Sequence, residues 1–377
     1  MKFELYEVEN YGGGVYRQLW WQRIHIDPLL LILLLMLAGV GVAILFSASG
    51  QNWAMLNRQF VRLGLAFFVM LVVAQVPPTV LREWSPWIFG ITVLMLVSVL
   101  LFGTVGKGAR RWLDLGFIRF QPSELMKLAM PMMVAHYFTN QHLPPKLKNA
   151  FIAITGIGLT ALMIAAQPDL GTSILVATSG LFVLFLAGLS WRFISISALL
   201  SAASAPLVWY LMKEYQRQRV RVFLNPESEP LGAGYHITQS KIALGSGGGY
   251  GKGWLNGTQS QLHFLPERST DFIFAVFGEE FGLWGILLLM ALYLAIIGRG
   301  LYIAATADST FGRLLAGSIT LTFGIYLIVN TGMVSGLLPV VGVPLPLISY
   351  GGTSMVSLMV GFGILMSIKT NRGFLKY

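Results

Sequence analysis

Long apolar runs dominate the chain, and most polar residues lie in the shorter stretches between them. Each run approaches the ~20 residues that an α-helix needs to cross ~30 Å of hydrocarbon, whereas strands of an outer-membrane barrel would alternate over about ten residues. The pattern therefore predicts an all-α polytopic membrane protein with ten transmembrane helices. The ten apolar segments are 27–48, 59–76, 86–103, 123–139, 150–166, 171–188, 193–212, 272–297, 313–333 and 348–369.

An even number of spans places both termini on one side of the membrane. With the long 213–270 loop discounted, twelve Lys and Arg residues lie in segments on that side and five on the other. Because the positive-inside bias acts mainly through short loops, we expect both termini to be cytoplasmic. The chain then divides into a tail at 1–26, a single membrane domain at 27–369 that includes the extracytoplasmic loop 213–270, and a tail at 370–377.

The composition supports a membrane protein. The 377 residues are 55% hydrophobic and 11% charged, against about 25% charged in an average soluble domain. The chain has no cysteine, which excludes a disulfide framework, a thiolate nucleophile and a cysteine-ligated metal. The net charge of +10 comes from Lys and Arg between the apolar segments. We therefore expect anionic membrane lipids or phosphate-bearing substrates as partners, and no nucleic acid.

Two stretches contain residues that break helices. The stretch "GSGGGYGKGW" at 245–254 lacks the spacing of a phosphate loop, and its glycines indicate either a flexible loop or a tight backbone approach. The stretch "SGLLPVVGVPLPLISYGGTS" at 335–354 has three prolines, which forbid a continuous helix. We expect a broken re-entrant segment that lines a cavity; an ordinary loop between two spans is the alternative.

Charged residues within membrane spans are costly, so each is a functional candidate. Glu124 and Lys127 are three residues apart and share a helix face. They form either a structural ion pair or a site in which Lys127 contacts an anionic substrate and Glu124 orients it. Asp169 lies between two spans, where it either caps a helix or pairs with Lys127 or a nearby arginine.

Several cations fall on the predicted outer side. Arg58 and Arg62 lie at the outer start of the second span, where they either reach lipid headgroups or bind phosphate. The cluster "KGARRWLDLGFIRF" at 107–120 keeps four basic residues there against the topological bias, Arg110 and Arg111 among them. Cations retained in this way are candidates for binding an anionic group.

The stretch "LHFLPERSTDFIFAVFGEEFG" at 262–282 concentrates charge beside an apolar helix. Asp271 directly precedes the helix, so it is either a helix cap or a general base whose field is set by Glu267 and Arg268. At ~1.5 Å per residue, Glu279 and Glu280 lie ~12 Å or more farther along. We expect them to be buried and neutral or paired with helix partners, and not to share the chemistry of Asp271.

Four motifs together resemble the SEDS family (shape, elongation, division and sporulation). They are "KGARRWLDLGFIRFQPSE", "QPDLGTSI", "FLPERSTDFIFAVFGEEFG" and "GLLPVVGVPLPLISYGGTS", and the similarity covers essentially all the predicted spans. The stretches "YQRQRV", "GAGYHITQSKIALGSGG" and "GTQSQL" look most like the RodA branch of rod-shaped Gram-negative bacteria. The division paralogue FtsW has a similar Asp motif.

The resemblance implies a peptidoglycan glycosyltransferase that polymerises lipid II into β-1,4-linked glycan at the outer face of the inner membrane during elongation. It places the essential aspartate of the family on Asp271, its membrane Glu and Lys on Glu124 and Lys127, its loop arginine on Arg58 and the "QPDLGT" acid on Asp169. It further implies a class B penicillin-binding transpeptidase and the elongation proteins MreC, MreD and MreB as partners.

The chemistry of that reaction suits these residues. Asp271 would take the proton of the acceptor hydroxyl, in a single displacement with inversion of the α-linked pyrophosphate. Basic groups would neutralise the leaving group, alone or with a divalent cation such as Mg²⁺ or Mn²⁺ held largely by the pyrophosphate. The candidate cations are Arg58, Arg110, Arg111 and Lys127. The sequence shows no cluster of metal ligands.

Two other functions are compatible with charges and prolines in the membrane. A flippase for the lipid-linked precursor would need polar groups spread along a path across the bilayer. A scaffold would only recruit a partner. The candidate residues gather toward the outer half of the predicted bundle, which favours the polymerase.

Overall fold

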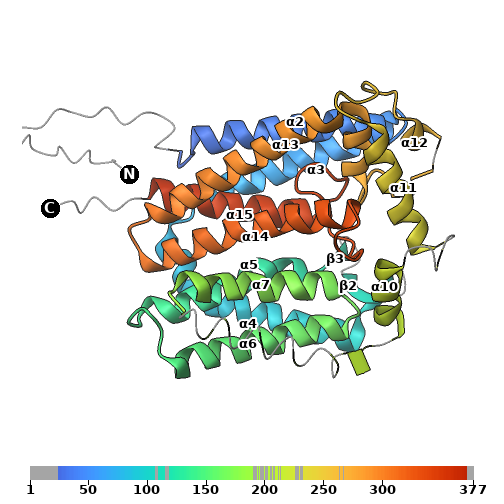
Figure 1. The fold of residues 1–377 in the computed structure, drawn as a ribbon. Coiled ribbons are helices and arrows are strands. Elements are labelled where there is room, and N and C mark those ends of the chain that lie inside the picture. Colours follow the sequence, from blue (N-terminus) through green and yellow to red (C-terminus); the bar gives the residue numbers. More distant parts are fainter. Residues whose placement is uncertain are drawn as a thin grey trace, which may run out of the picture.

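The computed structural model describes residues 24–106, 109–114, 119–189, 214–225, 232–262 and 267–371, together with single residues between these ranges. Within these ranges, the side chains of a few positions, including 104–106, 109–110, 114 and 119, are not described. Apolar helices form the body of the molecule (Figure 1). They are α2 (Pro28–Ala48), α3 (Trp53–Ala74), α4 (Pro78–Phe102), α5 (Pro122–Thr139), α6 (Leu147–Ala166), α7 (Leu170–Leu186), α13 (Ile273–Ala305), α14 (Thr310–Val334) and α15 (Thr353–Thr370).

Seven of these helices are long and apolar enough to cross a membrane, which confirms a mostly helical, multi-pass architecture. Helix α7 is apolar but shorter, with 17 residues. Helix α5 carries Glu124 and Lys127 and is buried on most of its surface, because α4, α7 and α14 pack around it. The predicted span at 193–212 lies mostly outside the described residues. Nine of the ten predicted segments therefore coincide with helices in the described part of the chain.

Local sequence explains where several helices begin. Asp27 caps α2 by accepting a hydrogen bond from the Leu30 amide at 3.0 Å, and Pro28 occupies the first turn. Asn52 caps α3 through the Met55 amide at 3.0 Å. Because of this cap, α3 begins six residues before the predicted span at 59–76. Arg58 therefore lies within a helix and not in the loop that the family resemblance implied.

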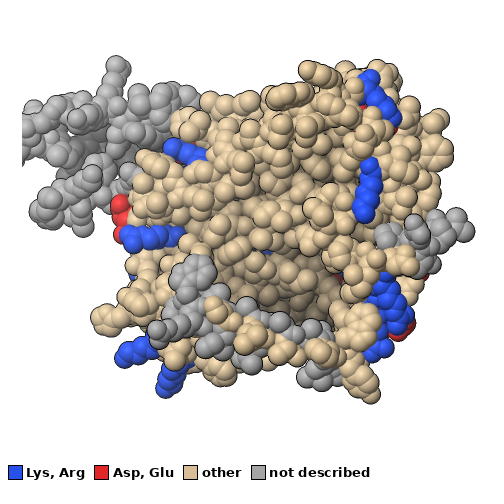
Figure 2. All heavy atoms as spheres, in the orientation of Figure 1, with Lys and Arg blue, Asp and Glu red and all other residues tan. Residues whose placement is uncertain are grey.

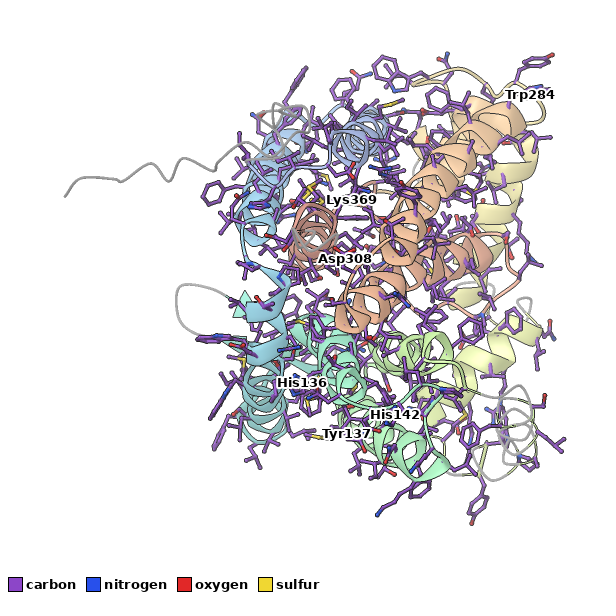
Figure 3. All side chains as sticks on the ribbon, turned by 90° about the vertical axis from the view of Figure 1, so that its left-hand side faces the viewer. His136, Tyr137, His142, Trp284, Asp308 and Lys369 are labelled. Atoms are coloured by element: carbon purple, nitrogen blue, oxygen red, sulfur yellow. The ribbon has the colours of Figure 1, made fainter. Side chains whose placement is uncertain are left out.

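The chain enters and leaves the bundle at the same end. His25 at the start of the described chain and Thr370 at the end of α15 are hydrogen-bonded, with Nδ1 and Oγ1 3.1 Å apart. At this end Arg299 also pairs with Asp27 at 2.6 Å. Figure 3 views the bundle along its helices from this end. Figure 2 shows that Lys and Arg lie toward the two ends of the molecule, whereas the middle of the visible face is uncharged and hollowed.

The opposite end carries the shorter elements (Figure 1). A small antiparallel sheet forms in the basic cluster, with the order β1 (Thr104–Gly106), β2 (Ala109–Asp114), β3 (Arg119–Phe120). The segment predicted as the loop 213–270 contains α10 (Glu214–Leu224), α11 (Ala233–Ser246) and α12 (Thr258–Gln261). The connection is therefore partly helical, and helix α11 packs against α13 and α14.

Candidate active site

The turn before α13 is held through its main-chain carbonyls. The Tyr350 amide donates a hydrogen bond to the Ser269 carbonyl at 2.8 Å, and Ser349 Oγ donates one to the Thr270 carbonyl at 2.6 Å. Ser349 Oγ also accepts from the Leu345 amide at 2.8 Å, which fixes its orientation. The segment between α14 and α15 therefore fastens the residues immediately before Asp271.

Asp271 lies half-buried at this turn. Its carbonyl accepts a hydrogen bond from Asn330 Nδ2 of α14 at 3.0 Å. Its carboxylate lies beside Gly342, 3.4 Å from where a Cβ would stand, and Gly342 has a φ of +75° that favours glycine. The N-cap of α13 is Phe272, and it makes no side-chain capping hydrogen bond. The structure therefore places the Asp271 carboxylate against the neighbouring segment.

The proline-containing segment between α14 and α15 is non-helical, as predicted, and its middle is buried against the bundle. Leu345, Leu347 and Ile348 are at most 2% exposed. The Tyr293 hydroxyl of α13 donates to the Pro346 carbonyl at 2.7 Å, so protein satisfies a backbone group freed at this depth. A cavity of about 190 Å³ lies between this segment, α7 and α14. We call residues 335–352 the re-entrant segment.

Basic side chains surround this end of the bundle. Arg58 is exposed on α3, and Arg62 one turn later places its guanidinium 4.4 Å from the centre of the Tyr350 ring. Arg268 donates a hydrogen bond to the Ser260 carbonyl, and burial lowers the pKa of Arg268 below its ordinary value. Arg62 therefore contacts the same re-entrant segment that fastens Asp271.

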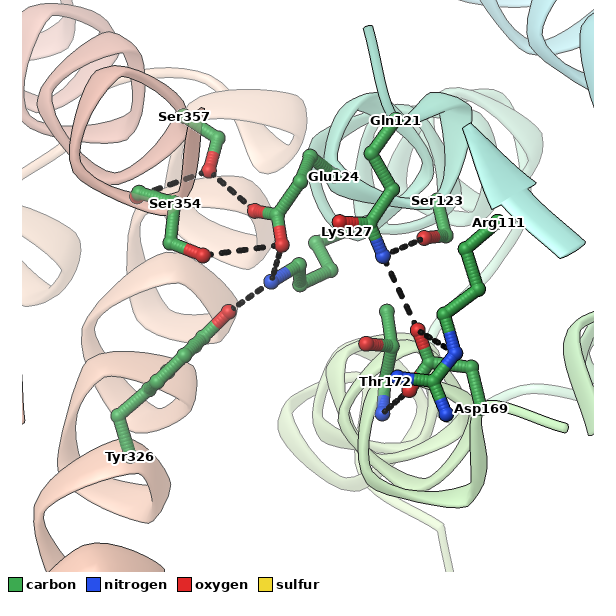
Figure 4. Close-up of polar contacts among 10 residues, drawn as sticks. All are labelled: Arg111, Gln121, Ser123, Glu124, Lys127, Asp169, Thr172, Tyr326, Ser354 and Ser357. Atoms are coloured by element: carbon green, nitrogen blue, oxygen red, sulfur yellow. Dashed lines mark hydrogen bonds and ion pairs between the residues drawn. The ribbon is translucent and has the colours of Figure 1, made fainter. Parts of the chain in front are cut away.

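Glu124 and Lys127 form a buried ion pair with 2.8 Å between Oε1 and Nζ (Figure 4). Ser354 and Ser357 of α15 donate to the two Glu124 oxygens at 3.0 and 2.8 Å, and Lys127 is hydrogen-bonded to the Tyr326 hydroxyl of α14. Lys127 is 7% exposed and Glu124 5%. The pair thus joins α5, α14 and α15, and Lys127 borders a small cavity of about 30 Å³.

Asp169 has two of the three partners considered for it, a helix terminus and an arginine, and the third, Lys127, pairs with Glu124. Its Oδ1 accepts from the Thr172 amide at 3.4 Å at the start of α7, and its Oδ2 lies 3.8 Å from Arg111 Nε (Figure 4). Gln121 Nε2 donates to the same Oδ2 at 3.0 Å, and Arg111 also donates to the Pro168 carbonyl. Arg111 therefore links strand β2 to this helix start. The side chain of Arg110 lies outside the described residues.

Glu279 and Glu280 are buried and bonded away from Asp271. Glu279 is fully buried and pairs with Lys252 Nζ at 2.8 Å. Its carboxylate also accepts from the Gln259 amide at 2.9 Å. Glu280 accepts a hydrogen bond from the Ser47 hydroxyl of α2. The prediction that both residues are buried is confirmed. Glu280 has a helix partner, whereas the partner of Glu279 lies in the glycine-rich stretch.

The glycine-rich stretch makes a tight backbone approach to helix α13 of the same chain. The amides of Lys252 and Gly253 donate to the carbonyls of Glu279 and Glu280, both at 3.0 Å. A Cβ on Gly251, whose φ is +79°, would stand 2.1 Å from the Glu280 carbonyl oxygen. Helix α13 bends at this contact, where Gly282 has a φ of 63°.

His236 of α11 lies over the start of α13. Its ring stacks on Phe272 with centroids 5.7 Å apart. Burial lowers the pKa of His236, and the nearby Glu267 carboxylate opposes this shift in part. Glu267 is exposed and accepts a hydrogen bond from Thr270 Oγ1 at 2.8 Å. This turn therefore meets α11 as well as the re-entrant segment.

The described parts of the chain offer few ligands for a metal ion. No three His, Asp or Glu side chains gather there in an arrangement that could bind one. The carboxylates of Glu124, Asp169 and Glu279 are each already bound to a cation of the protein. A divalent cation would therefore need most of its ligands from a substrate.

The sequence reasoning missed three residues of this site. Asn330, Ser349 and Tyr350 are uncharged, and they bind main-chain atoms 59 to 81 positions earlier in the chain. The rule that intramembrane charges mark function does not detect them. An isolated asparagine in an apolar span was the one available signal for Asn330.

Comparisons with known proteins identify relatives of this chain by sequence and by structure. A family model described as "Cell cycle protein", for FtsW, RodA and SpoVE, matches residues 24–373. The "Peptidoglycan glycosyltransferase MrdB" of Escherichia coli strain K12 is 57% identical over 360 residues, 95% of this chain and 97% of that protein. A chain solved in work on "Structural coordination of polymerization and crosslinking by a peptidoglycan synthase complex" has a TM-score of 0.81 and 29% identity, covering 92% of this chain and 98% of that one. The rod shape determining protein RodA of Thermus thermophilus has a TM-score of 0.69 and 26% identity, covering 92% and 97%.

Proposed function

The chain belongs to the FtsW/RodA/SpoVE family of cell cycle proteins, and we propose that it is a peptidoglycan glycosyltransferase of the inner membrane. Its substrate is lipid II, a disaccharide-pentapeptide on undecaprenyl pyrophosphate. The product is β-1,4-linked glycan, made at the outer face of the membrane during elongation. The observation that supports this reaction best is the setting of Asp271, a half-buried carboxylate on a turn whose carbonyls at positions 269–271 are each hydrogen-bonded.

Asp271 acts as the general base. The acceptor hydroxyl is a weak nucleophile and must lose its proton as it attacks the anomeric carbon of the donor. The carboxylate lies at the end of the bundle that carries the shorter elements, next to the re-entrant segment. Because the α-linked pyrophosphate becomes a β-linkage, a single displacement with inversion needs one carboxylate only. The separate bonding of Glu279 and Glu280 agrees with this.

Cations at the same end neutralise the pyrophosphate as it leaves. Arg58 is exposed and Arg111 is about one third exposed, so both guanidinium groups are accessible to an anionic group. Arg268 extends this basic surface, and Lys127 is held by Glu124 farther inside. We include Arg110 among these cations from the sequence alone. A divalent cation, Mg²⁺ or Mn²⁺, would supply further neutralisation when bound with the pyrophosphate.

The membrane domain has ten transmembrane helices, and the one added to the nine described above is the seventh in chain order, at 193–212. Leu186 at the end of α7 lies against Gly317 near the start of α14, whereas Asp271 before α13 lies by Asn330 near the end of α14. These two contacts support one further crossing of the bundle between α7 and α13. Both termini are then cytoplasmic, in agreement with the distribution of Lys and Arg.

A class B penicillin-binding transpeptidase crosslinks the glycan in the same complex. This proposal is supported by the similarity to a chain of a peptidoglycan synthase complex that coordinates polymerisation and crosslinking. We extend it to the elongation proteins MreC, MreD and MreB, on the basis of the resemblance to the RodA branch.

Reconstitution of the purified protein with its transpeptidase on fluorescent lipid II tests the function. Asp271→Asn keeps the shape of the side chain and removes the base, so we expect glycan synthesis to fall by about 10²–10⁴-fold. Asp308→Asn, an exposed aspartate at the opposite end of the bundle, is the control and should leave the rate unchanged. Wild-type rates from Asp271→Asn would contradict the role of the base. A complex that moved lipid II between leaflets without polymerising it would replace this function by a flippase.

A further inference from the structure

Asn330 is a fully buried amide in α14 that connects two main-chain segments. Its Nδ2 donates to the Asp271 carbonyl at 3.0 Å and to the Val343 carbonyl at 2.7 Å. Both acceptors are carbonyl oxygens, so only the amide nitrogen can face them, and this fixes the orientation of the side chain. A buried amide whose two donors are both used is a directional link and cannot be replaced by packing alone.

The two hydrogen bonds reach the main chain of Asp271 and the main chain of the segment that its carboxylate faces. One acceptor is the carbonyl of Asp271 itself, and the other follows Gly342, against which the carboxylate lies. The neighbouring carbonyls of Ser269 and Thr270 are bonded by the re-entrant segment alone. Asn330 thus ties both the turn and the re-entrant segment to a transmembrane helix.

We propose that Asn330 is a positioning residue for glycosyl transfer, because it holds the main chain of Asp271 in a fixed position relative to Gly342, beside which the Asp271 carboxylate lies. This inference rests on the proposed role of Asp271 as the base. A base displaced by about 1 Å can lose about 10²-fold in rate. The link acts on the geometry of the carboxylate and does not touch the substrate, so its loss should lower kcat and leave KM nearly unchanged.

Ser318 provides a matched control on the same helix. It is also fully buried, and its hydroxyl donates to the Ser179 carbonyl of α7 at 2.6 Å. It lies twelve residues before Asn330, about 18 Å along the helix. Ser318→Ala removes a buried hydrogen bond between helices without affecting the turn of Asp271.

The experiment measures lipid II polymerisation by the complex with its transpeptidase, together with thermal unfolding of each variant. We expect kcat of Asn330→Ala to be at least tenfold below that of Ser318→Ala, with KM within about twofold. Asn330→Asp keeps the shape but places an acceptor against two carbonyls, so it should lose at least as much. Asn330→Ser retains one donor and should recover part of the rate. If the alanine variant does not purify folded, the aspartate variant is judged by the same tenfold criterion.

A difference in kcat of less than tenfold from Ser318→Ala would overturn the inference. A rise in KM with kcat unchanged would also overturn it, because that would place Asn330 in substrate binding. Failure of the proposed function looks different: the wild-type complex makes no glycan, or Asp271→Asn retains the full rate. The Asn330 inference fails by itself when the wild type is active, Asp271→Asn is inactive and Asn330→Ala matches the control.

Discussion

Replacing Lys127 with methionine tests whether the buried ion pair is structural or binds substrate. The change removes the ammonium at 2.8 Å from Glu124 and keeps most of the side-chain volume. Glu124 then retains only the hydroxyl hydrogen bonds of Ser354 and Ser357. Its negative charge would stay in a site that is 5% exposed.

The expected magnitude follows from this burial. Breaking a buried ion pair by removing one partner costs about 3–5 kcal/mol, because the remaining charge is uncompensated. For a chain of this size, a loss of this magnitude corresponds to a fall in the thermal midpoint on the order of 5–10 °C. The double variant Glu124→Gln/Lys127→Met removes both charges and keeps an amide for the two serines, so its midpoint should return to near the wild type.

The assay combines thermal unfolding of the purified protein with lipid II polymerisation. If the pair is structural, the double variant should recover both the midpoint and the rate. If Lys127 contacts the pyrophosphate, the double variant should recover the midpoint and remain slow. Arg221→Met is the matched control, because it breaks the exposed pair with Glu214, which contributes at most about 1 kcal/mol.

One result would refute the reasoning from burial. A Lys127→Met midpoint equal to that of Arg221→Met would show that the Glu124 charge is not isolated from water in the folded protein. The pair would then have no structural role, whatever the rate of polymerisation.

Two further predictions concern α11 and the glycine-rich stretch. Gly251→Ala should lower the thermal midpoint by several degrees, because the new Cβ would stand 2.1 Å from a carbonyl oxygen and the φ of +79° favours glycine. Gly245→Ala is the control and should raise the midpoint slightly, because no atom lies within 4 Å of its Cβ position. Equal midpoints for the two variants would contradict the tight approach. Burial lowers the pKa of His236, so the folded state favours its neutral form, and the resulting stability is present above the ordinary pKa of about 6.5 and lost as the pH falls below it. Midpoints measured from about pH 7.5 to about pH 5 should therefore fall less steeply for His236→Gln than for the wild type, and parallel curves would contradict this.

The apolar runs predicted most of the bundle because the length of a run alone identifies a spanning helix. They did not predict the beginnings of α3 and α4, which include Arg58, Arg82 and Glu83 and which start at a cap or a proline. They also could not show that α13 bends at Gly282. A glycine within an apolar run is compatible with a straight helix, and here the bend depends on contacts with residues 248–253, which are distant in sequence.

The candidate site could be predicted only in part, for a similar reason. The cost of charge in a membrane identified Glu124, Lys127 and Asp169, and the structure gives each of them a partner. It does not identify an uncharged residue whose role is to hold a main-chain carbonyl. Asn330 and Ser349 are of this kind, and their partners became visible only when the fold brought the re-entrant segment to the turn.

Two of the charged residues near Asp271, Glu279 and Glu280, help to hold the first part of α13 in place. The first part of α13, residues 273–281, is held at its beginning by the bonded carbonyls of the preceding turn. It is held at its end by Glu279, which binds Lys252, and by Glu280, which binds Ser47 of α2. A segment fastened at both ends cannot rotate about its axis, so the carboxylate that begins it keeps one direction relative to the bundle. The deeper glutamates therefore hold the helix that follows Asp271, and this explains why an apolar helix begins among so many charges.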